Sequence, residues 1–215
     1  MTFAAIWDLD GVLVDTSRAH YQSWVEALAS TRMTLSYPNF SVSFGMNNDS
    51  ILKLWLGPDT PQVLIDQIGD KKEEIFRRLV AAQVDVLPGV RALLESLRQA
   101  GFRQAVASSA PQANIDVLLD ATGLRPFFEA VVSASGLPSK PDPAVYLEAA
   151  AHLSVPPARC VVIEDASAGV EGARRGGMIC IAVTNTNPAA LLSGASLVVD
   201  SLEKVSVETF SRLLA

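Results

Sequence analysis

The sequence has little cysteine and no long hydrophobic run. Only two of its 215 residues are cysteines, Cys160 and Cys180, too few for a disulfide framework. Both lie in short apolar stretches, so we expect small buried side chains in a protein of the reducing cytoplasm. No stretch approaches the roughly 20 apolar residues that cross a bilayer, and no basic residue precedes Asp8. We therefore expect neither a membrane span nor a signal peptide.

Charge is also scarce, and basic residues are fewer than acidic ones. Charged residues make up 19% of the chain and hydrophobic residues 49%, a balance that excludes an intrinsically disordered protein. The chain carries 17 Lys and Arg against 23 Asp and Glu. An acidic surface repels phosphate backbones, so we expect no nucleic-acid partner. The length suits one domain, alone or with a smaller unit inserted into it, and nothing in it requires more than a monomer.

What the sequence does contain is a series of short apolar runs. Most are rich in β-branched residues and lack polar alternation, which is typical of strands buried on both faces of a parallel sheet. The runs are residues 4–7, 104–107, 130–132, 161–163, 179–183 and 197–199. Helical spacing of apolar residues, with proline and glycine at the ends, predicts helices over 90–97, 111–122, 143–152 and 166–175. The alternation predicts an α/β fold with a Rossmann-like parallel sheet.

Residues 16–85 interrupt this alternation. They contain no convincing buried strand, and their apolar residues, Trp24, Trp55 and Phe76 among them, fall at helical spacing. We therefore expect a small helical unit over 16–85, inserted after the first strand, and a sheet domain made of 1–15 and 86–215.

Polar side chains follow four of the predicted strands. The carboxyl ends of parallel strands meet at one edge of the sheet, where ligands bind. One edge should therefore gather four carboxylates, two hydroxyls and one lysine, in chain order Asp8, Asp10, Ser108, Ser109, Lys140, Glu164 and Asp165. Each residue alone has a structural alternative, such as a turn-forming acid or a serine that caps a helix. Their joint position at strand ends favours a shared site.

The chemistry of this set points to phosphoryl transfer. Four carboxylates in an apolar site need a counter-charge, and Mg²⁺ with oxygen ligands is the usual choice where phosphate also binds. Ser108 and Ser109 directly precede a predicted helix, whose free N–H groups bind anions. Lys140 adds a mobile cation. The sequence thus predicts a Mg²⁺ and phosphate site for a small phosphorylated metabolite.

At these residues the sequence resembles the haloacid dehalogenase superfamily. The segment DLDGVLVDT, from Asp8 to Thr16, is similar to the first motif of the phosphatase and phosphomutase branches. Ser108 matches the second motif, Lys140 the third, and Glu164 with Asp165 the fourth. The helical insertion resembles the cap of the β-phosphoglucomutase-like branch.

The resemblance implies roles for the acids. Asp8 would be the nucleophile that forms an aspartyl-phosphate, and Asp10 the general acid and then the general base. Mg²⁺ would be held by Asp8, the backbone carbonyl of Asp10 and Asp165, with Glu164 at or next to the ion. A second carboxylate in the first motif argues against dehalogenation, because that reaction protonates no alkoxide.

The resemblance also implies that Ser108, Ser109 and Lys140 bind the transferring phosphoryl group, with Lys140 offsetting the repulsion between phosphate and Asp8. Cap residues would set specificity, and His20, Asn47 and Asn48 are the candidates for substrate contacts.

Two short segments of the sequence help to decide between a phosphatase and a mutase. The mutase branch usually has an arginine after a glycine like Gly45, and a serine and a lysine after the second-motif serine. Here Met-Asn-Asn follows Gly45 and Ser-Ala-Pro follows Ser108, whereas His20 resembles the mutase pattern. We therefore expect a phosphatase acting on a sugar phosphate or similar metabolite. The alternatives are a sugar phosphomutase and, more remotely, a non-catalytic protein that binds a phosphorylated metabolite.

Overall fold

The chain divides into two compact units. The computed structural model describes residues 2–31, 33–43 and 46–215. One unit joins the segment before Thr16 to Asp85–Ala215, and the other is Thr16–Val84. We call them the sheet unit and the helical unit and describe each by itself.

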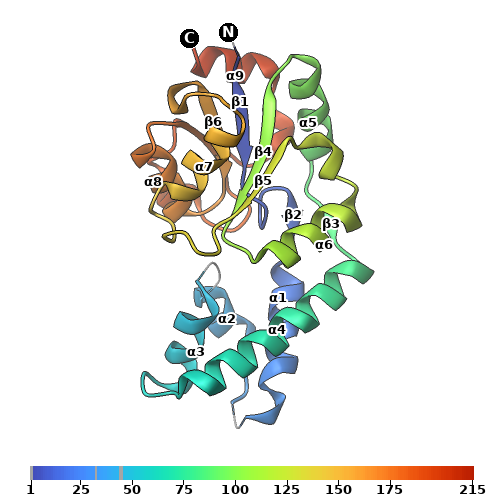
Figure 1. The fold of residues 1–215 in the computed structure, drawn as a ribbon, viewed down its shortest axis with the longest axis vertical. Helices are drawn as coiled ribbons and strands as arrows, with labels where there is room; N and C mark the ends of the chain where they lie inside the picture. The colour runs from blue at the N-terminus through green and yellow to red at the C-terminus, as the bar shows by residue number, and fades with distance from the viewer. Residues whose placement is uncertain (1, 32, 44–45) are drawn as a thin grey trace. The chain divides into compact units, whose positions relative to one another are not determined.

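The sheet unit is built on a six-stranded parallel sheet (Figure 1). Its order is β5-β4-β1-β6-β7-β8. The bounds are β1 Ala4–Trp7, β4 Arg103–Ser108, β5 Ala130–Ser133, β6 Cys160–Glu164, β7 Ile179–Val183 and β8 Leu197–Val199. All six strands predicted from apolar runs are confirmed. Since the order reverses between β1 and β6, the crevice beyond their carboxyl ends is where a ligand is expected.

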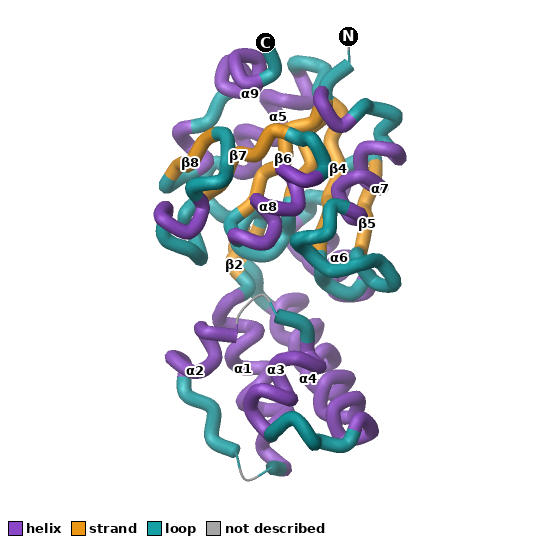
Figure 2. The backbone as a smooth tube through the Cα atoms, turned by 90° about the vertical axis from the view of Figure 1, so that its left-hand side faces the viewer, coloured by secondary structure: helices purple, strands orange, loops and turns teal. Residues whose placement is uncertain are grey.

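Helices cover both faces of this sheet. They are α5 Val90–Gln99, α6 Gln112–Thr122, α7 Ala144–His152, α8 Ser167–Arg175 and α9 Val207–Leu213. One face carries α7 and α8 (Figure 2). These helices pack on alternate residues of the strands, such as Ile6 and Val162. On the other face, the buried Gln104 side chain accepts a hydrogen bond from Trp7 and donates one to the Leu94 carbonyl of α5. The strands are thus buried on both sides, as their composition predicts.

Cys160 and Cys180 are free and buried, as their apolar surroundings predict. In the described part of the chain, no helix combines the length and apolar character that crossing a membrane requires.

A short antiparallel ladder stands where the chain leaves the sheet unit and returns to it. Strands β2 Val14–Asp15 and β3 Asp85–Val86 pair with Val14 opposite Val86. The Leu87 N–H donates to the Leu13 carbonyl and extends the pairing. This ladder ties the two connecting segments together.

The helical unit contains α1 Ser17–Ala27, α2 Tyr37–Ser43, α3 Asn48–Leu56 and α4 Gln62–Ala82. Helix α4 is the longest, and α1 and α3 both pack against it. Trp24 of α1 and Trp55 of α3 meet edge to face, with ring centroids 5.2 Å apart, and Ile65 and Ile68 of α4 are buried in the same cluster. The described residues of 16–84 hold no strand, as the helical spacing of their apolar residues predicts.

Candidate active site

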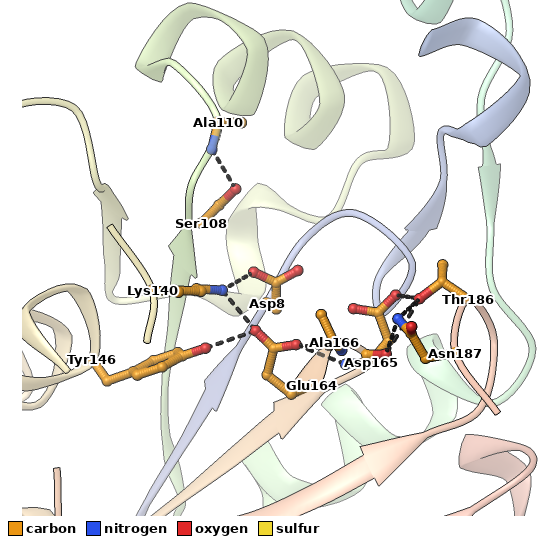
Figure 3. Close-up of polar contacts among 10 residues, drawn as sticks. All are labelled: Asp8, Ser108, Ala110, Lys140, Tyr146, Glu164, Asp165, Ala166, Thr186 and Asn187. Carbon is orange, nitrogen blue, oxygen red and sulfur yellow. Dashed lines mark hydrogen bonds and ion pairs between the residues drawn. The ribbon is translucent and has the colours of Figure 1, made fainter. Parts of the chain in front are cut away.

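Three acidic side chains meet at the point where the strand order reverses. Asp8 follows β1, Glu164 ends β6, and Asp165 follows β6. The strands are in register at this end, and the Asp8 N–H donates to the Ile163 carbonyl at 3.0 Å. All three acids are buried, and one carboxylate oxygen from each lies within 4.8 Å of the others. The structure thus brings together three of the four acids predicted for this edge (Figure 3).

Lys140 reaches into this cluster from the loop between β5 and α7. Its Nζ lies 2.5 Å from Asp8 Oδ1 and 2.7 Å from Glu164 Oε1. Its side chain is 9% exposed. One buried ammonium group thus bridges acids at the carboxyl ends of two neighbouring strands (Figure 3).

Glu164 is the most firmly held of these acids. Its Oε1 accepts from Lys140 and from the Tyr146 hydroxyl at 2.7 Å. Its Oε2 accepts from the backbone N–H groups of Asp165 and Ala166, at 2.8 and 2.9 Å. A Cβ on Gly169 of α8 would lie 1.8 Å from Oε1, so the carboxylate occupies space that only a glycine leaves open. Tyr146 and Gly169 were not among the predicted site residues.

The charges in the cluster do not balance. Burial, with repulsion from Glu164, raises the pKa of Asp8 to about 7 although Lys140 opposes this. Burial and the repulsion of Glu164 and Asp8 also raise the pKa of Asp165. For Lys140, burial alone would lower the pKa, but attraction to Asp8 and Glu164 outweighs it and the pKa rises. Three buried carboxylates share one ammonium, and their hard oxygen donors fit a divalent cation such as Mg²⁺.

Asp10 lies in a tight turn beside this cluster. It is half-buried, and its backbone bridges to Val14. The next residue, Gly11, has φ +78°, and a Cβ there would lie 2.0 Å from Asp165 Oδ2. In the described part of the chain, the acids close enough to share an ion are Asp8, Glu164 and Asp165. The Asp10 side chain is therefore placed next to the acid cluster and not in it.

The two predicted serines differ. Ser108 ends β4 and is buried, and its Oγ accepts from the Ala110 N–H at 3.0 Å. Ser109 is exposed. Helix α6 starts at Gln112 and its N-cap residue is Pro111, so neither serine is the cap. Ser108 stands at the same sheet edge as the acids, and the capping alternative does not apply.

The loop after β7 adds side chains that were not predicted. Thr186 donates a short hydrogen bond to Asp165 Oδ2, Asn187 donates to the Asp165 backbone carbonyl at 3.0 Å, and Asn185 donates to the Gly11 carbonyl at 2.8 Å. A signal was present in the sequence, because the polar run Thr-Asn-Thr-Asn follows a predicted buried strand just as the acids do.

The three candidates in the helical unit all have partners there. The His20 ring stacks on Phe76 with centroids 4.1 Å apart. Asn47 Oδ1 accepts from the Ser50 N–H and so caps α3, and Asn48 donates to Glu73. Contacts between these residues and a substrate remain a prediction. Gly45, the glycine after which the mutase branch usually has an arginine, lies outside the described residues.

Comparison with known proteins agrees with the sequence motifs. A family model described as haloacid dehalogenase-like hydrolase matches residues 4–177. The chain belongs to this family. The range includes every residue of the acid cluster and Lys140, and the predicted resemblance is confirmed. The chain is accordingly an enzyme of the hydrolase class.

The relatives of this haloacid dehalogenase-like hydrolase include both phosphatases and a mutase. It is 31% identical over 189 residues to hexitol phosphatase B of Escherichia coli K12, covering 84% of this chain and 82% of that protein. It is 30% identical over 213 residues to β-phosphoglucomutase of Bacillus subtilis, covering 95% and 92%. Among solved structures, β-phosphoglucomutase from Clostridium difficile has a TM-score of 0.87 and 25% identity, covering 100% of this chain and 97% of that one.

Proposed function

We propose that this protein hydrolyses a small phosphate monoester with the help of Mg²⁺. The observation that carries the proposal is the position of Asp8, whose Oδ1 lies 2.5 Å from Lys140 Nζ within a buried acid cluster. A carboxylate held beside a cation at a strand end is placed to attack a bound phosphoryl group. The named relatives support phosphate esters as substrates, and sugar phosphates are the class we favour.

The donor set suggests how a cation would be held. Asp8, Asp165 and the backbone carbonyl of Asp10 would bind Mg²⁺, which when bound offsets negative charge and polarises the phosphoryl oxygens. Glu164 already accepts two hydrogen bonds on each oxygen. Its role in the proposal is therefore to fix Lys140 beside the ion and not to ligate it directly.

The chain's own residues then carry the reaction. An Asp8 oxygen attacks phosphorus and the ester P–O bond breaks, while Asp10 gives a proton to the departing alcohol oxygen. Asp10 next takes a proton from a water molecule, which attacks phosphorus and releases phosphate and free Asp8. Lys140 favours the ionised form of Asp8 and, with Ser108, binds the phosphoryl oxygens. Selection of the substrate is assigned to the helical unit as part of the same proposal.

Phosphate release tests this mechanism. We would assay sugar phosphates, hexitol phosphates and pyrophosphate with Mg²⁺ and after EDTA treatment, and expect release only with Mg²⁺. Asp8→Asn should reduce turnover to background, and Asp10→Asn should reduce it about 10²–10⁴-fold. The matched control is Asp200→Asn, since Asp200 also follows a strand but is exposed and paired with Lys204.

Three results would contradict the proposal. Near-normal turnover by a folded Asp8→Asn protein would overturn the nucleophile, and full turnover in EDTA would overturn the cation. No release from any substrate would instead favour the protein that binds phosphorylated metabolites without hydrolysing them.

A phosphomutase is the second candidate, because a β-phosphoglucomutase is among the relatives at 30% identity over nearly the whole chain. Hexose 1-phosphates with and without a hexose bisphosphate activator separate the two activities. A phosphatase releases inorganic phosphate in both conditions. Formation of hexose 6-phosphate that depends on the activator, with little phosphate released, would identify a mutase.

A further inference from the structure

We propose that Thr186 is a positioning residue that aims the Asp165 carboxylate for cation binding, and that Asn187 sets the direction of its hydroxyl. The inference rests on the proposed function, because it takes Asp165 to be a ligand of the cation. Thr186 lies in the loop after β7, and β7 pairs with β6, the strand that Asp165 follows.

The hydrogen bonds in this loop form a chain with one direction. The Asn187 amide donates to Thr186 Oγ1 at 3.1 Å and to the Asp165 backbone carbonyl at 3.0 Å. Since Thr186 Oγ1 accepts from Asn187, its single hydrogen points away from that amide. That hydrogen goes to Asp165 Oδ2, the closer acceptor, and the Asp165 carbonyl lies farther off at 3.2 Å. Asn187 therefore directs the hydroxyl at the carboxylate.

The backbone of the first motif closes the other side of the same oxygen. A Cβ on Gly11 would lie 2.0 Å from Asp165 Oδ2 and 2.8 Å from Thr186 Cγ2. Asn185 holds this glycine by donating to its carbonyl at 2.8 Å. Oδ2 is thus enclosed between the Thr186 side chain and the Gly11 backbone.

This enclosure determines which oxygen is presented to the ion. With Oδ2 held by Thr186, the second oxygen of Asp165 lies on the side of Asp8 (Figure 3). Asp165 and Asp8 offer oxygens within 4.8 Å of each other. Without the Thr186 hydroxyl, nothing in this hydrogen-bond chain would stop the carboxylate from rotating. Groups that orient metal ligands in this way typically change metal affinity about 10- to 100-fold.

Direct binding of Mg²⁺ to the whole protein tests the inference. We would measure the Kd by isothermal titration calorimetry for the wild type, Thr186→Val and Thr186→Ser. Valine has almost the same shape but no hydroxyl, so we expect the Kd to rise about 10- to 100-fold. Serine keeps the hydroxyl and should bind nearly as the wild type does. Asn187→Ala should weaken binding in the same direction, because it frees the hydroxyl to turn.

Thr122→Val is the matched control. Thr122 also lies in the sheet unit, where it is buried and its hydroxyl donates to the Leu118 carbonyl within α6. Thr122→Val removes a threonine hydroxyl from the sheet unit, as Thr186→Val does, but leaves the acid cluster unchanged. The Kd for Mg²⁺ should therefore stay at its wild-type value. Circular dichroism of each variant checks folding, and if Thr186→Val fails to fold, Thr186→Ser and Asn187→Ala still decide the question.

The outcomes separate this inference from the function it rests on. Wild-type Kd values in folded Thr186→Val and Asn187→Ala proteins would overturn the inference, as would equal losses in Thr186→Ser and Thr186→Val. If the wild type releases phosphate only with Mg²⁺ while these Kd values are unchanged, only the inference fails. If the wild type binds no Mg²⁺, both fail.

Discussion

Glu164 illustrates how much a single side chain depends on its neighbours. It is fully buried, yet its pKa is lowered, because Lys140 and hydrogen-bond donors outweigh the cost of burial. The carboxylate fits because α8 presents Gly169 to it with no Cβ. A methyl group at that position would therefore act on Lys140 and Asp8 through Glu164.

We predict that Gly169→Ala destabilises the protein and lowers its activity. The new Cβ would lie 1.8 Å from Glu164 Oε1, so the carboxylate must move away from Lys140. Overpacking of this kind costs about 1–3 kcal/mol. Urea denaturation would measure the loss of stability, and the kcat for phosphate release would measure the loss of activity.

Gly69→Ala provides the control for this prediction. Gly69 lies within α4, and a Cβ there would lie 3.6 Å from the Asn48 side chain, an ordinary packing distance. Alanine in a helix interior is about 0.5–1 kcal/mol more favourable than glycine, so this variant should be slightly more stable than the wild type. If Gly169→Ala were stabilised equally, Glu164 would not be held as the structure indicates.

At the scale of elements, Asn47 shows that a candidate contact can have a structural role. It precedes α3, and its Oδ1 accepts from the Ser50 N–H at 2.9 Å. We predict that Asn47→Ala lowers stability by about 1 kcal/mol, the usual cost of losing an N-cap. Asn47→Asp should keep wild-type stability, because aspartate also accepts this bond and its charge suits a helix N-terminus.

Kinetics of the same two variants distinguish capping from substrate binding. A residue that only caps α3 leaves the KM of Asn47→Asp unchanged. A clear rise in KM without loss of stability would instead place Asn47 at the substrate.

The elements predicted from sequence are those with a strong apolar pattern. Runs such as 161–163 are buried on both faces, and their composition alone identifies them as strands. Helix α9 buries only Phe210, and β2 and β3 have two residues each, so none of the three has a periodic pattern to detect.

The site follows the same logic. Acids and a lysine at the ends of predicted strands could be assigned because topology brings those ends together. Tyr146 could not, because it acts through another side chain, Glu164, and that contact exists only once the chain is folded. Thr186 stands in a polar run after a predicted strand, which marks its place, but the sequence does not show its hydrogen bond to Asp165. Tyr146 in particular occupies a buried position in α7, where sequence alone indicates ordinary core packing.

For the whole molecule, the acid cluster connects folding stability with pH. The pKa of Asp8 rises from 3.8 to about 7 in the folded protein. Between these values the folded state keeps a proton that the unfolded chain has lost, so this group stabilises the fold at low pH and loses that effect as pH rises through about 7. Asp165, whose pKa is also raised, acts in the same direction. If the proposed function holds, Mg²⁺ should offset the loss, because a cation that binds only the folded state stabilises it.

We predict that Asp8→Asn makes the metal-free protein more stable than the wild type at pH 8, by a few kcal/mol at most, since each pKa unit is worth about 1.4 kcal/mol. The raised pKa already includes the attraction of Lys140, so removing the charge is a net gain. At pH 5.5 Asp8 in the wild type is largely protonated, and the advantage should shrink. Calorimetry in EDTA gives the Tm of the variant and of the wild type at each pH, and the difference between the two proteins measures the advantage. The other titrating groups are common to both proteins, so their contributions largely cancel in that difference. If the variant has the same advantage at pH 5.5 and at pH 8, Asp8 is ionised at both pH values and Lys140 alone stabilises its charge. The acid cluster would then need no further cation.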